Sequence, residues 1–261
     1  MNVRWGEHPW EEIRDYARDG ALAVAPFGST EQHGPMLPLD TDIHIAERVA
    51  LSGARRAWED FRIPVLVLPV MPVGLASHHM RFAGTLCLQP ETYITMASEV
   101  LACVVEHGFR KIAVISGHGG NVPGLQLAIK KTIHQFRDDF TLRIALFQGH
   151  QDAEMRKMRR DIWDGQPSEG QPAIHASRSE TSETLADRPH LVRRDRMVRP
   201  TLEVESIPEW SWQTHQLSET GAFGDPSLAN AELGEKLWES WAQPVALFLK
   251  RLWEAPISPE Q

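Results

Sequence analysis

The sequence alternates short apolar runs with stretches of helical periodicity. Four apolar runs of six to eight residues are bounded by glycine, proline or polar residues, which is typical of buried strands; they cover 21–26, 63–70, 111–116 and 141–147. Between them, apolar side chains recur every three or four positions, as in amphipathic helices, over 43–59, 91–107 and 124–136. This alternation predicts an α/β fold with a mostly parallel sheet and helices on both faces.

Beyond residue 148 the alternation is less regular. The sequence predicts a charged helix over 151–161 and a long amphipathic helix over 229–253. The Gly, Pro and Gln-rich stretch 164–173 is typical of a loop that forms a lid. No internal repeat or shift in composition divides the chain. Because α/β folds often reach 261 residues undivided, we expect one domain over residues 1–261.

Charge and hydropathy exclude two kinds of partner. The net charge is −8, whereas nucleic acids and anionic membranes are bound through clustered Lys and Arg. The basic pairs, Arg159-Arg160 among them, are short and fit solvated helix faces. No apolar run approaches the roughly 20 residues of a membrane span. We therefore expect neither a nucleic acid nor a membrane as partner.

The two cysteines and the N-terminus bear on the compartment. Cys87 and Cys103 stand in apolar stretches, which favours buried free thiols in a reducing compartment. The N-terminal residues MNVRWGEHPWEE lack the apolar core of a secretion signal. We expect a cytoplasmic protein.

The loop after the first apolar run is rich in metal-ligating residue types. It reads FGSTEQHGPMLPLDTD over 27–42. Glu31 and His33 are two residues apart and project to the same side of extended backbone, and Asp42 stands where the next helix starts and its dipole stabilises a carboxylate. Imidazole and carboxylate groups together suit Zn²⁺, Mn²⁺ or Fe²⁺. The alternative is a set of ordinary turn and capping residues.

A second polar motif, SGHGGN over 116–121, follows the third apolar run. Reactive groups of parallel sheets gather at the carboxyl ends of strands, so His118 is a candidate ligand beside the first loop. The N–H groups of Gly119 and Gly120 could stabilise a developing oxyanion. The alternative is a plain glycine-rich turn with a hydrogen-bonded histidine.

A third polar motif, HASRSETS over 175–182, follows the predicted lid. His175 and Glu180 would converge only across a loop. Glu180 also fits the first turn of a helix, where acidic residues are common, so a capping role is its alternative.

These motifs, in this order, resemble the creatininase (creatinine amidohydrolase) family. The resemblance runs from about Val24 to Leu237 and includes GSTEQHGPMLPLDTD, HHMRFAGTLCL, SGHGGN, HASRSETS and GAFGDPSLANAELGEKL. It implies a three-layer α/β/α fold with a mostly parallel central sheet. It also implies a centre of one or two divalent ions, hydrolysis of an amide C–N bond, and assembly as a homo-oligomer, hexamers included.

The resemblance assigns roles to individual residues. The family's first four ligands match Glu31, His33, Asp42 and His118, with Asp42 as the carboxylate that bridges two metals. Creatinine-cleaving members have a further Glu ligand where this chain has Gly120, and we expect Glu180 to substitute for it. His175 matches the family's catalytic histidine, which donates a proton to the leaving nitrogen.

The substrate pocket departs from that of creatinine-cleaving members. His79 matches a pocket histidine, whereas His78 stands where an acid is often found. No tryptophan precedes His175 on the lid, which disfavours creatinine itself. Trp210 and Trp212 could line the pocket or pack a loop, and the tryptophans of the last helix, Trp238, Trp241 and Trp253, are expected to form a packing stripe, within the chain or against another subunit.

We therefore expect a metal-dependent hydrolase that cleaves a non-peptide C–N bond, in an amide, cyclic amide or formamide, of a small molecule. One alternative is a peptidase that trims a cofactor-precursor peptide. The other is a non-catalytic, metal-dependent binding protein, against which the presence of His175 argues, since binding alone has no use for a proton donor.

Overall fold

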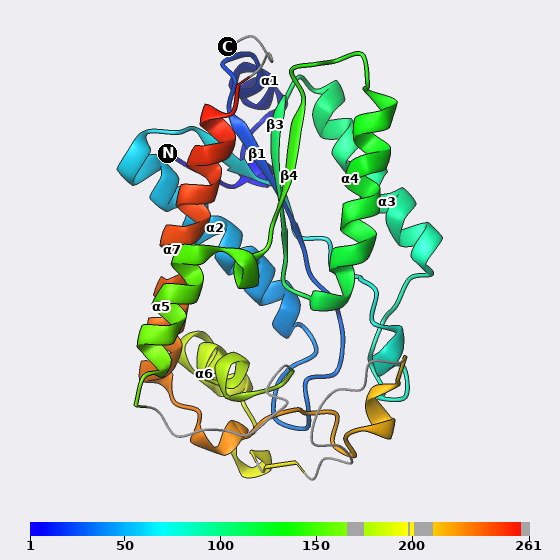
Figure 1. Ribbon diagram of the computed structural model, residues 1–261, viewed down its shortest axis with the longest axis vertical. Helices are drawn as coiled ribbons and strands as arrows, with labels where there is room; N and C mark the ends of the chain where they lie inside the picture. The colour runs from blue at the N-terminus through cyan, green and yellow to red at the C-terminus, as the bar shows by residue number, and fades with distance from the viewer. Residues whose placement is uncertain (166–174, 198, 201–210, 257–261) are drawn as a thin grey trace.

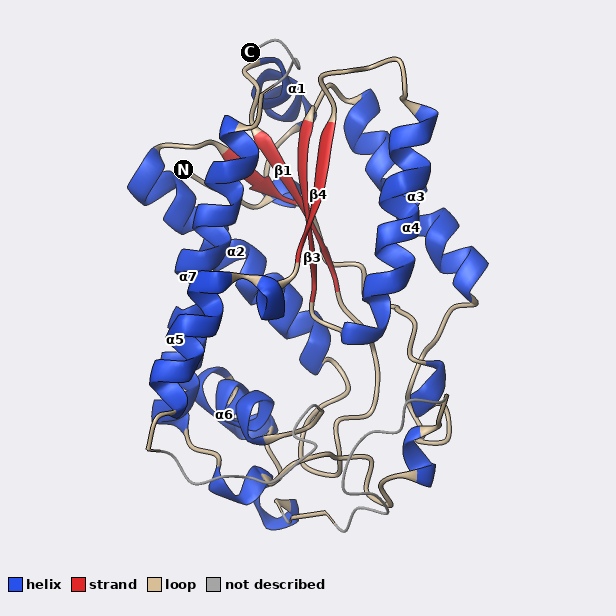
Figure 2. Ribbon diagram, in the orientation of Figure 1, coloured by secondary structure: helices blue, strands red, loops and turns tan. Residues whose placement is uncertain are grey.

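The computed structural model describes residues 1–165, 175–197, 199–200 and 211–256. At its centre lies a sheet of four parallel strands in the order β2-β1-β3-β4, seen at the middle of Figure 2. The strands are β1 (Leu22–Phe27), β2 (Val65–Val67), β3 (Lys111–Ser116) and β4 (Arg143–Phe147). The predicted α/β fold with a parallel sheet is confirmed.

Helices cover both faces of this sheet (Figure 1). One face carries α2 (Thr41–Phe61), α5 (Ala153–Trp163) and α7 (Ala231–Glu254), and the other carries α3 (Pro90–Glu106) and α4 (Val122–Gln135). Helix α1 (Trp10–Arg18) packs with the second group, and α6 (Arg178–Asp187) packs on α7 beyond the strand ends. Short 3-10 helices lie at Trp5–Glu7, Ser77–His79, Gly119–Asn121, Gly149–Gln151, Pro189–Leu191, Arg194–Arg196, Thr214–Gln216 and Pro226–Leu228.

Strand β1 divides the core into two layers. All six of its residues are buried, as expected for a central strand covered on both faces. Leu22 and Val24 belong to the cluster packed under α2 and α7, whereas Ala23 and Ala25 belong to the cluster under α3 and α4. The alternation of side chains along the strand therefore supplies both layers.

Several expectations need correction in detail. Strand β2 has three residues instead of eight, because Pro64 and Pro69 on either side lack the N–H that a strand would use for pairing. Cys103 was expected to be buried, but it lies on the exposed side of α3, and Cys87 is only partly buried. Both cysteines are free thiols, as expected.

Other expectations concern the lid and the tryptophan stripe. The expected lid falls largely on residues 166–174, which lie outside the described residues. Trp238 is buried in the core under α7, and Trp241 and Trp253 pack against the same cluster, so the stripe packs within the chain. No helix among the described residues is long and apolar enough to cross a membrane.

The topology leaves a crevice where β1 and β3 end. These strands are neighbours, but the helices that follow them, α2 and α4, lie on opposite faces of the sheet. Loops that diverge in this way at the carboxyl ends of parallel strands form the usual binding crevice of such sheets. The polar motifs predicted to carry the chemistry follow these two strands.

Candidate metal centre

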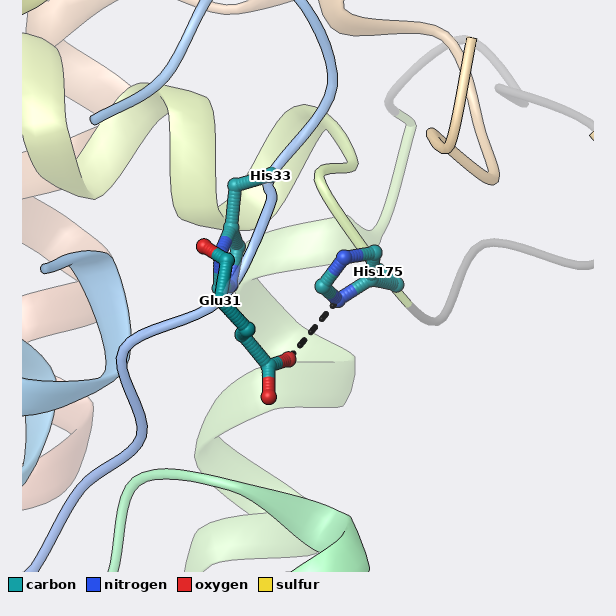
Figure 3. Close-up of side chains that lie close together, drawn as sticks. All are labelled: Glu31, His33 and His175. Carbon is teal, nitrogen blue, oxygen red and sulfur yellow. Dashed lines mark hydrogen bonds and ion pairs between the residues drawn. The ribbon is translucent and has the colours of Figure 1, made fainter. Parts of the chain in front are cut away.

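The three polar motifs meet in this crevice. Glu31 and His33 come from the loop after β1, Asp42 from the first turn of α2, and His118 directly follows the turn that ends β3. Figure 3 shows His175 facing Glu31 and His33 from a separate segment, whereas Glu31 and His33 share one loop. These side chains are buried, so the loops enclose a compact set of ligating groups.

Asp42 joins the two halves of the cluster. Its Oδ1 lies 3.1 Å from Nε2 of His33, and its Oδ2 lies 3.3 Å from Nδ1 of His118. Nδ1 of His118 is also 3.1 Å from Oε1 of Glu31. Three overlapping groups have ligand atoms within 4.8 Å of one another: Glu31, His33 and His175; Glu31, Asp42 and His118; His33, Asp42 and Glu180.

Backbone carbonyls orient three of the histidines. His33 contacts the carbonyl of Glu31 through Nδ1 at 3.2 Å, and His118 contacts the carbonyl of Leu75 through Nε2 at 3.2 Å. The Nε2 of His175 contacts the carbonyl of Gln32 at 2.8 Å. A carbonyl can only accept, so each of these nitrogens carries the proton, and the other ring nitrogen faces the carboxylates. Metal-ligating histidines have this arrangement.

The sequence left two roles open for Glu180, a metal ligand and a helix cap, and its position in the structure suits both. It lies in the first turn of α6, where its Oε2 accepts a hydrogen bond from the Ala176 N–H at 2.5 Å. Its Oε1 lies 4.0 Å from Nε2 of His33. One carboxylate oxygen therefore caps the chain before the helix, and the other faces the cluster.

The cluster holds more negative charge than its neighbours satisfy. Both carboxylate oxygens of Glu31 and Oδ2 of Asp42 are buried, and none accepts a hydrogen bond from the described part of the chain. Burying an uncompensated carboxylate costs several kcal/mol, roughly, which a native site avoids by pairing it with a cation. These orphaned oxygens, together with the histidine nitrogens facing them, fit a bound divalent metal ion.

The pKa shifts express the same imbalance. Burial opposes the charge on His33, but the Asp42 carboxylate raises the pKa of this imidazole to about 10. The pKa of His118 is likewise raised well above its usual value, against burial, by Asp42 and Glu31. Burial also raises the pKa of Glu31 and raises that of Glu180 to about 7. The carboxylates require compensation, either by protons on the histidines or by a metal ion that replaces them.

A cavity of about 560 Å³ opens onto the cluster. Its lining residues include Gly119, Gly120, His78, Trp212 and Phe223. Trp212 therefore lines the pocket, whereas Trp210 lies outside the described residues. The cavity volume falls in the range of roughly 300 to 1,000 Å³ that is usual for small-molecule sites.

Sequence reasoning missed Gln32. This buried residue contacts His79 with its side-chain amide and holds His175 through its backbone carbonyl. Its position between Glu31 and His33 was the available signal, since the alternation of side chains turns it to the other side of the ligands. His79, an expected pocket residue, lies with its Nε2 3.4 Å from Oε1 of Glu31.

Comparison with known proteins places the chain in a family. The model of the creatininase family, described as creatinine amidohydrolase, matches residues 6–249. This chain belongs to the creatininase family. As a member it is an enzyme of the metal-dependent hydrolase type, and the expected resemblance is confirmed.

Named relatives of this creatininase-family chain differ in activity. A mycofactocin precursor peptide peptidase of Mycobacterium tuberculosis is 34% identical over 228 residues, covering 82% of this chain and 79% of the relative. The creatinine amidohydrolase of Pseudomonas putida is 24% identical over 254 residues, covering 92% of this chain and 94% of the relative.

Solved creatininases share the fold. The crystal structure of a creatinine amidohydrolase matches with a TM-score of 0.84 at 21% identity, covering 98% of this chain and 100% of that one. A manganese creatininase matches with a TM-score of 0.83 at 21% identity, and the match covers 97% of this chain and 100% of that one. A mutant creatininase of the Zn-Zn type matches with a TM-score of 0.81 at 21% identity, and the match covers 97% of this chain and 99% of that one.

Gly120, the departure from creatinine-cleaving members, has a local structural reason in this creatininase-family chain. A Cβ placed on Gly120 would lie 2.4 Å from Nε2 of His118 and 2.7 Å from the carbonyl oxygen of Leu75. A side chain at this position would therefore displace the contact that orients His118. Gly120 and the present position of His118 require each other.

Proposed function

We propose that this protein hydrolyses an amide C–N bond with two divalent metal ions that Glu31, His33, His118 and Glu180 would hold together with Asp42, which belongs to both ligand groups. The observation that carries the proposal is the placement of the Asp42 carboxylate, with one oxygen facing His33 and the other facing His118. Two ligand groups thus share one carboxylate: Glu31, Asp42 and His118 form one, and His33, Asp42 and Glu180 form the other.

The metals are zinc, manganese or iron by the chemistry of the ligands. Mixed imidazole and carboxylate sets accept all three ions, and solved creatininases include a manganese form and a Zn-Zn form. When bound, such ions supply Lewis acidity and lower the pKa of water toward neutrality. Glu180 would complete the second group in place of the Glu that this chain lacks at Gly120.

His175 is proposed to accept a proton at Nδ1 from the attacking water and to pass it to the leaving nitrogen. Its Nε2–H is held by the Gln32 carbonyl, so only Nδ1 faces the centre. That Nδ1 lies 3.8 Å from Oε1 of Glu31, farther than the 3.1 Å of His118, which favours proton transfer over ligation. The N–H groups of Gly119 and Gly120 are proposed to stabilise the oxyanion from the cavity wall, and His79 to hold Glu31.

The proposed substrate is a small molecule with an amide, cyclic amide or formamide group, which the cavity can accommodate. Trimming of a peptide is the second candidate. The observation that favours it is the 34% identity to the mycofactocin precursor peptide peptidase, against 24% to the creatinine amidohydrolase.

The release of a primary amine tests all of these activities together. Protein reconstituted with Zn²⁺ or Mn²⁺ is incubated with a formamide, a cyclic amide and a short peptide, and new amine groups are measured by fluorescent labelling. We expect amine release from at least one of the three substrate classes, and no release once the metal is removed. His175→Ala should lose turnover while its metal content is unchanged. If His175→Ala loses metal, His175 is a ligand instead. If fully loaded protein releases no amine from any class, a metal-dependent binding protein is the better account.

A further inference from the structure

A second cavity, of about 620 Å³, adjoins the proposed metal centre. It shares His118 and Gly119 with the first cavity and extends from there between the end of β4 and helix α5. Its floor is apolar, with Val49, Phe147 and Met155 among the lining residues. A ligand seated in this second cavity would therefore lie beside the metal centre.

Arginines line one wall of the second cavity. Arg156, Arg159 and Arg160 stand on α5, and Trp163 follows them on the same wall. Their spacing of three, four and seven residues places all four on one side of the helix. The sequence favoured a solvated face for Arg159-Arg160; Arg160 is indeed exposed, and the structure also places the pair on this cavity wall. We call the three residues Arg156, Arg159 and Arg160 the arginine wall.

The charge of this cavity is opposite to that of the chain. The chain has a net charge of −8, but no Asp or Glu of the described residues lines the cavity. Arg159 is paired with the buried Glu183 at 3.3 Å, and Arg156 donates from Nη1 to the Gln151 carbonyl at 2.7 Å. The guanidinium of Arg160 has no hydrogen bond or ion pair with any described residue, although its backbone carbonyl accepts the N–H of Asp164 at 2.9 Å. The wall therefore keeps an excess of positive charge.

Aromatic packing holds part of the wall in place. The guanidinium of Arg159 stacks on the Trp241 ring at 4.7 Å, and Trp241 Nε1 donates to the same Glu183 oxygen at 3.0 Å. Glu183, Arg159 and Trp241 thus form a fixed group, with planar guanidinium edges beside flat apolar surface. Guanidinium groups bind carboxylates and phosphates through paired hydrogen bonds, and an apolar floor accepts the rest of the ligand.

We propose that the arginine wall binds an anionic group of the substrate, a carboxylate or a phosphate monoester on an apolar or aromatic body, while its amide lies at the metal centre. Only the placement of the substrate amide at the metal centre rests on the proposed function. The anion site itself is a property of α5 and the cavity, and it can be measured without turnover.

Binding of small probes tests the site. The probes are N-acetyl-L-phenylalanine and phenyl phosphate, with N-acetyl-L-phenylalaninamide as the uncharged control, titrated calorimetrically into the metal-loaded protein. The variants are Arg160→Gln and Arg156→Gln, which remove a charge from the wall. The matched control is Lys157→Gln, which removes the same charge from the exposed side of the same helix.

We expect at least one acid to bind about tenfold or more tightly than the amide, since charge-assisted contacts are the stronger ones. Arg160→Gln should remove most of this preference, and Lys157→Gln should retain it. The acid that binds identifies the anion. The proposal would be overturned if the acids bound no more tightly than the amide, or if neither acid bound at millimolar concentration. It would also be overturned if Lys157→Gln lost as much of the preference for the acid as Arg160→Gln.

Two further readouts separate this proposal from the proposed function. If the acids bind through the arginine wall but no amide is hydrolysed, the anion site stands and the hydrolase proposal fails. If amides are hydrolysed and the kcat/KM of a charged amide is the same in wild type and Arg160→Gln, the hydrolase proposal stands and the anion site fails.

Discussion

The backbone carbonyl of Gln32 accepts a hydrogen bond from Nε2 of His175 at 2.8 Å. The side-chain amide of Gln32 lies 2.7 Å from Nδ1 of His79, and its Oε1 accepts the N–H of Gly34, which fixes which end of the amide donates. Nδ1 of His79 is therefore an acceptor, and its Nε2–H faces Glu31. One buried residue sets the tautomers of two histidines around the metal centre.

Gln32→Glu should disturb these tautomers without removing packing. A carboxylate oxygen would face Nδ1 of His79, so the ring would move its proton there, and Nε2 would no longer present a proton to Glu31. We expect a loss of about 10- to 100-fold in metal affinity or in kcat, as for other partners of metal ligands. ¹⁵N chemical shifts of the histidine rings report the tautomer. Gln135→Glu, on the exposed side of α4, is the control; a wild-type tautomer and affinity in Gln32→Glu would refute the role.

Gly120→Ala should weaken metal binding, whereas Gly119→Ala should not. A Cβ on Gly120 meets Nε2 of His118 at 2.4 Å, while a Cβ on Gly119 has no atom within 4 Å. Displacing one ligand of several lowers metal affinity by about tenfold or more, by analogy with changes to the partners of ligands. Equilibrium titration of Zn²⁺ or Mn²⁺ against a competing chelator compares the two variants. Equal affinities would show that His118 is not held as described.

Asn121→Ala should destabilise the fold at the crevice. The buried Asn121 amide accepts the Leu75 N–H at 2.8 Å and donates to the Gly28 carbonyl at 3.0 Å, so it ties the loop after β1 to the turn after β3. Leaving both backbone groups without partners costs about 2 to 4 kcal/mol. Urea unfolding measures the loss, with Asn2→Ala at the exposed N-terminus as the control, and a loss below about 0.5 kcal/mol would contradict the bridging role.

Metal-free protein should lose stability as the pH rises. The pKa of His33 is about 10 in the fold, against about 6.5 when unfolded, so the folded state binds more protons between these values. Its stabilising contribution is complete below about pH 6.5 and is lost toward pH 10, and His118 acts in the same direction. Metal replaces these protons, so binding should release protons and tighten with pH. Unfolding of chelator-treated protein at pH 7 and 9.5 checks the sign; greater stability at pH 9.5 would contradict it.

The central strands and the ligand motifs could be predicted from the sequence because each depends on local order. Strand β3 matches the apolar run 111–116 at both ends, and the order of polar motifs after β1 and β3 places Glu31, Asp42 and His118 together once the sheet is parallel. β2 was predicted too long from its apolar run, although Pro64 and Pro69 within that run limit the pairing.

The rest of the site depends on contacts between distant segments. The carbonyl partners of His118 and His175 belong to Leu75 and Gln32, 43 and 143 residues away along the chain. The cavity wall formed by Arg159 and Arg160 depends on how α5 lies beside β4, which the charge pattern does not indicate. Such relationships follow from tertiary packing and leave little trace in local sequence.

Elemental analysis of the metal content per chain, on protein purified without chelator and reconstituted, would show whether two metal ions bind and whether Glu180 is a ligand; wild type is compared with Glu180→Gln. The glutamine keeps an oxygen that can accept the Ala176 N–H, so the variant separates the cap from the ligand. We expect close to two metal ions per chain in wild type. Glu180→Gln should hold fewer metal ions, while its free energy of unfolding is unchanged. No metal in reconstituted wild type would contradict the account, and an unchanged content near one would leave Glu180 as a cap alone and refute the two-metal centre.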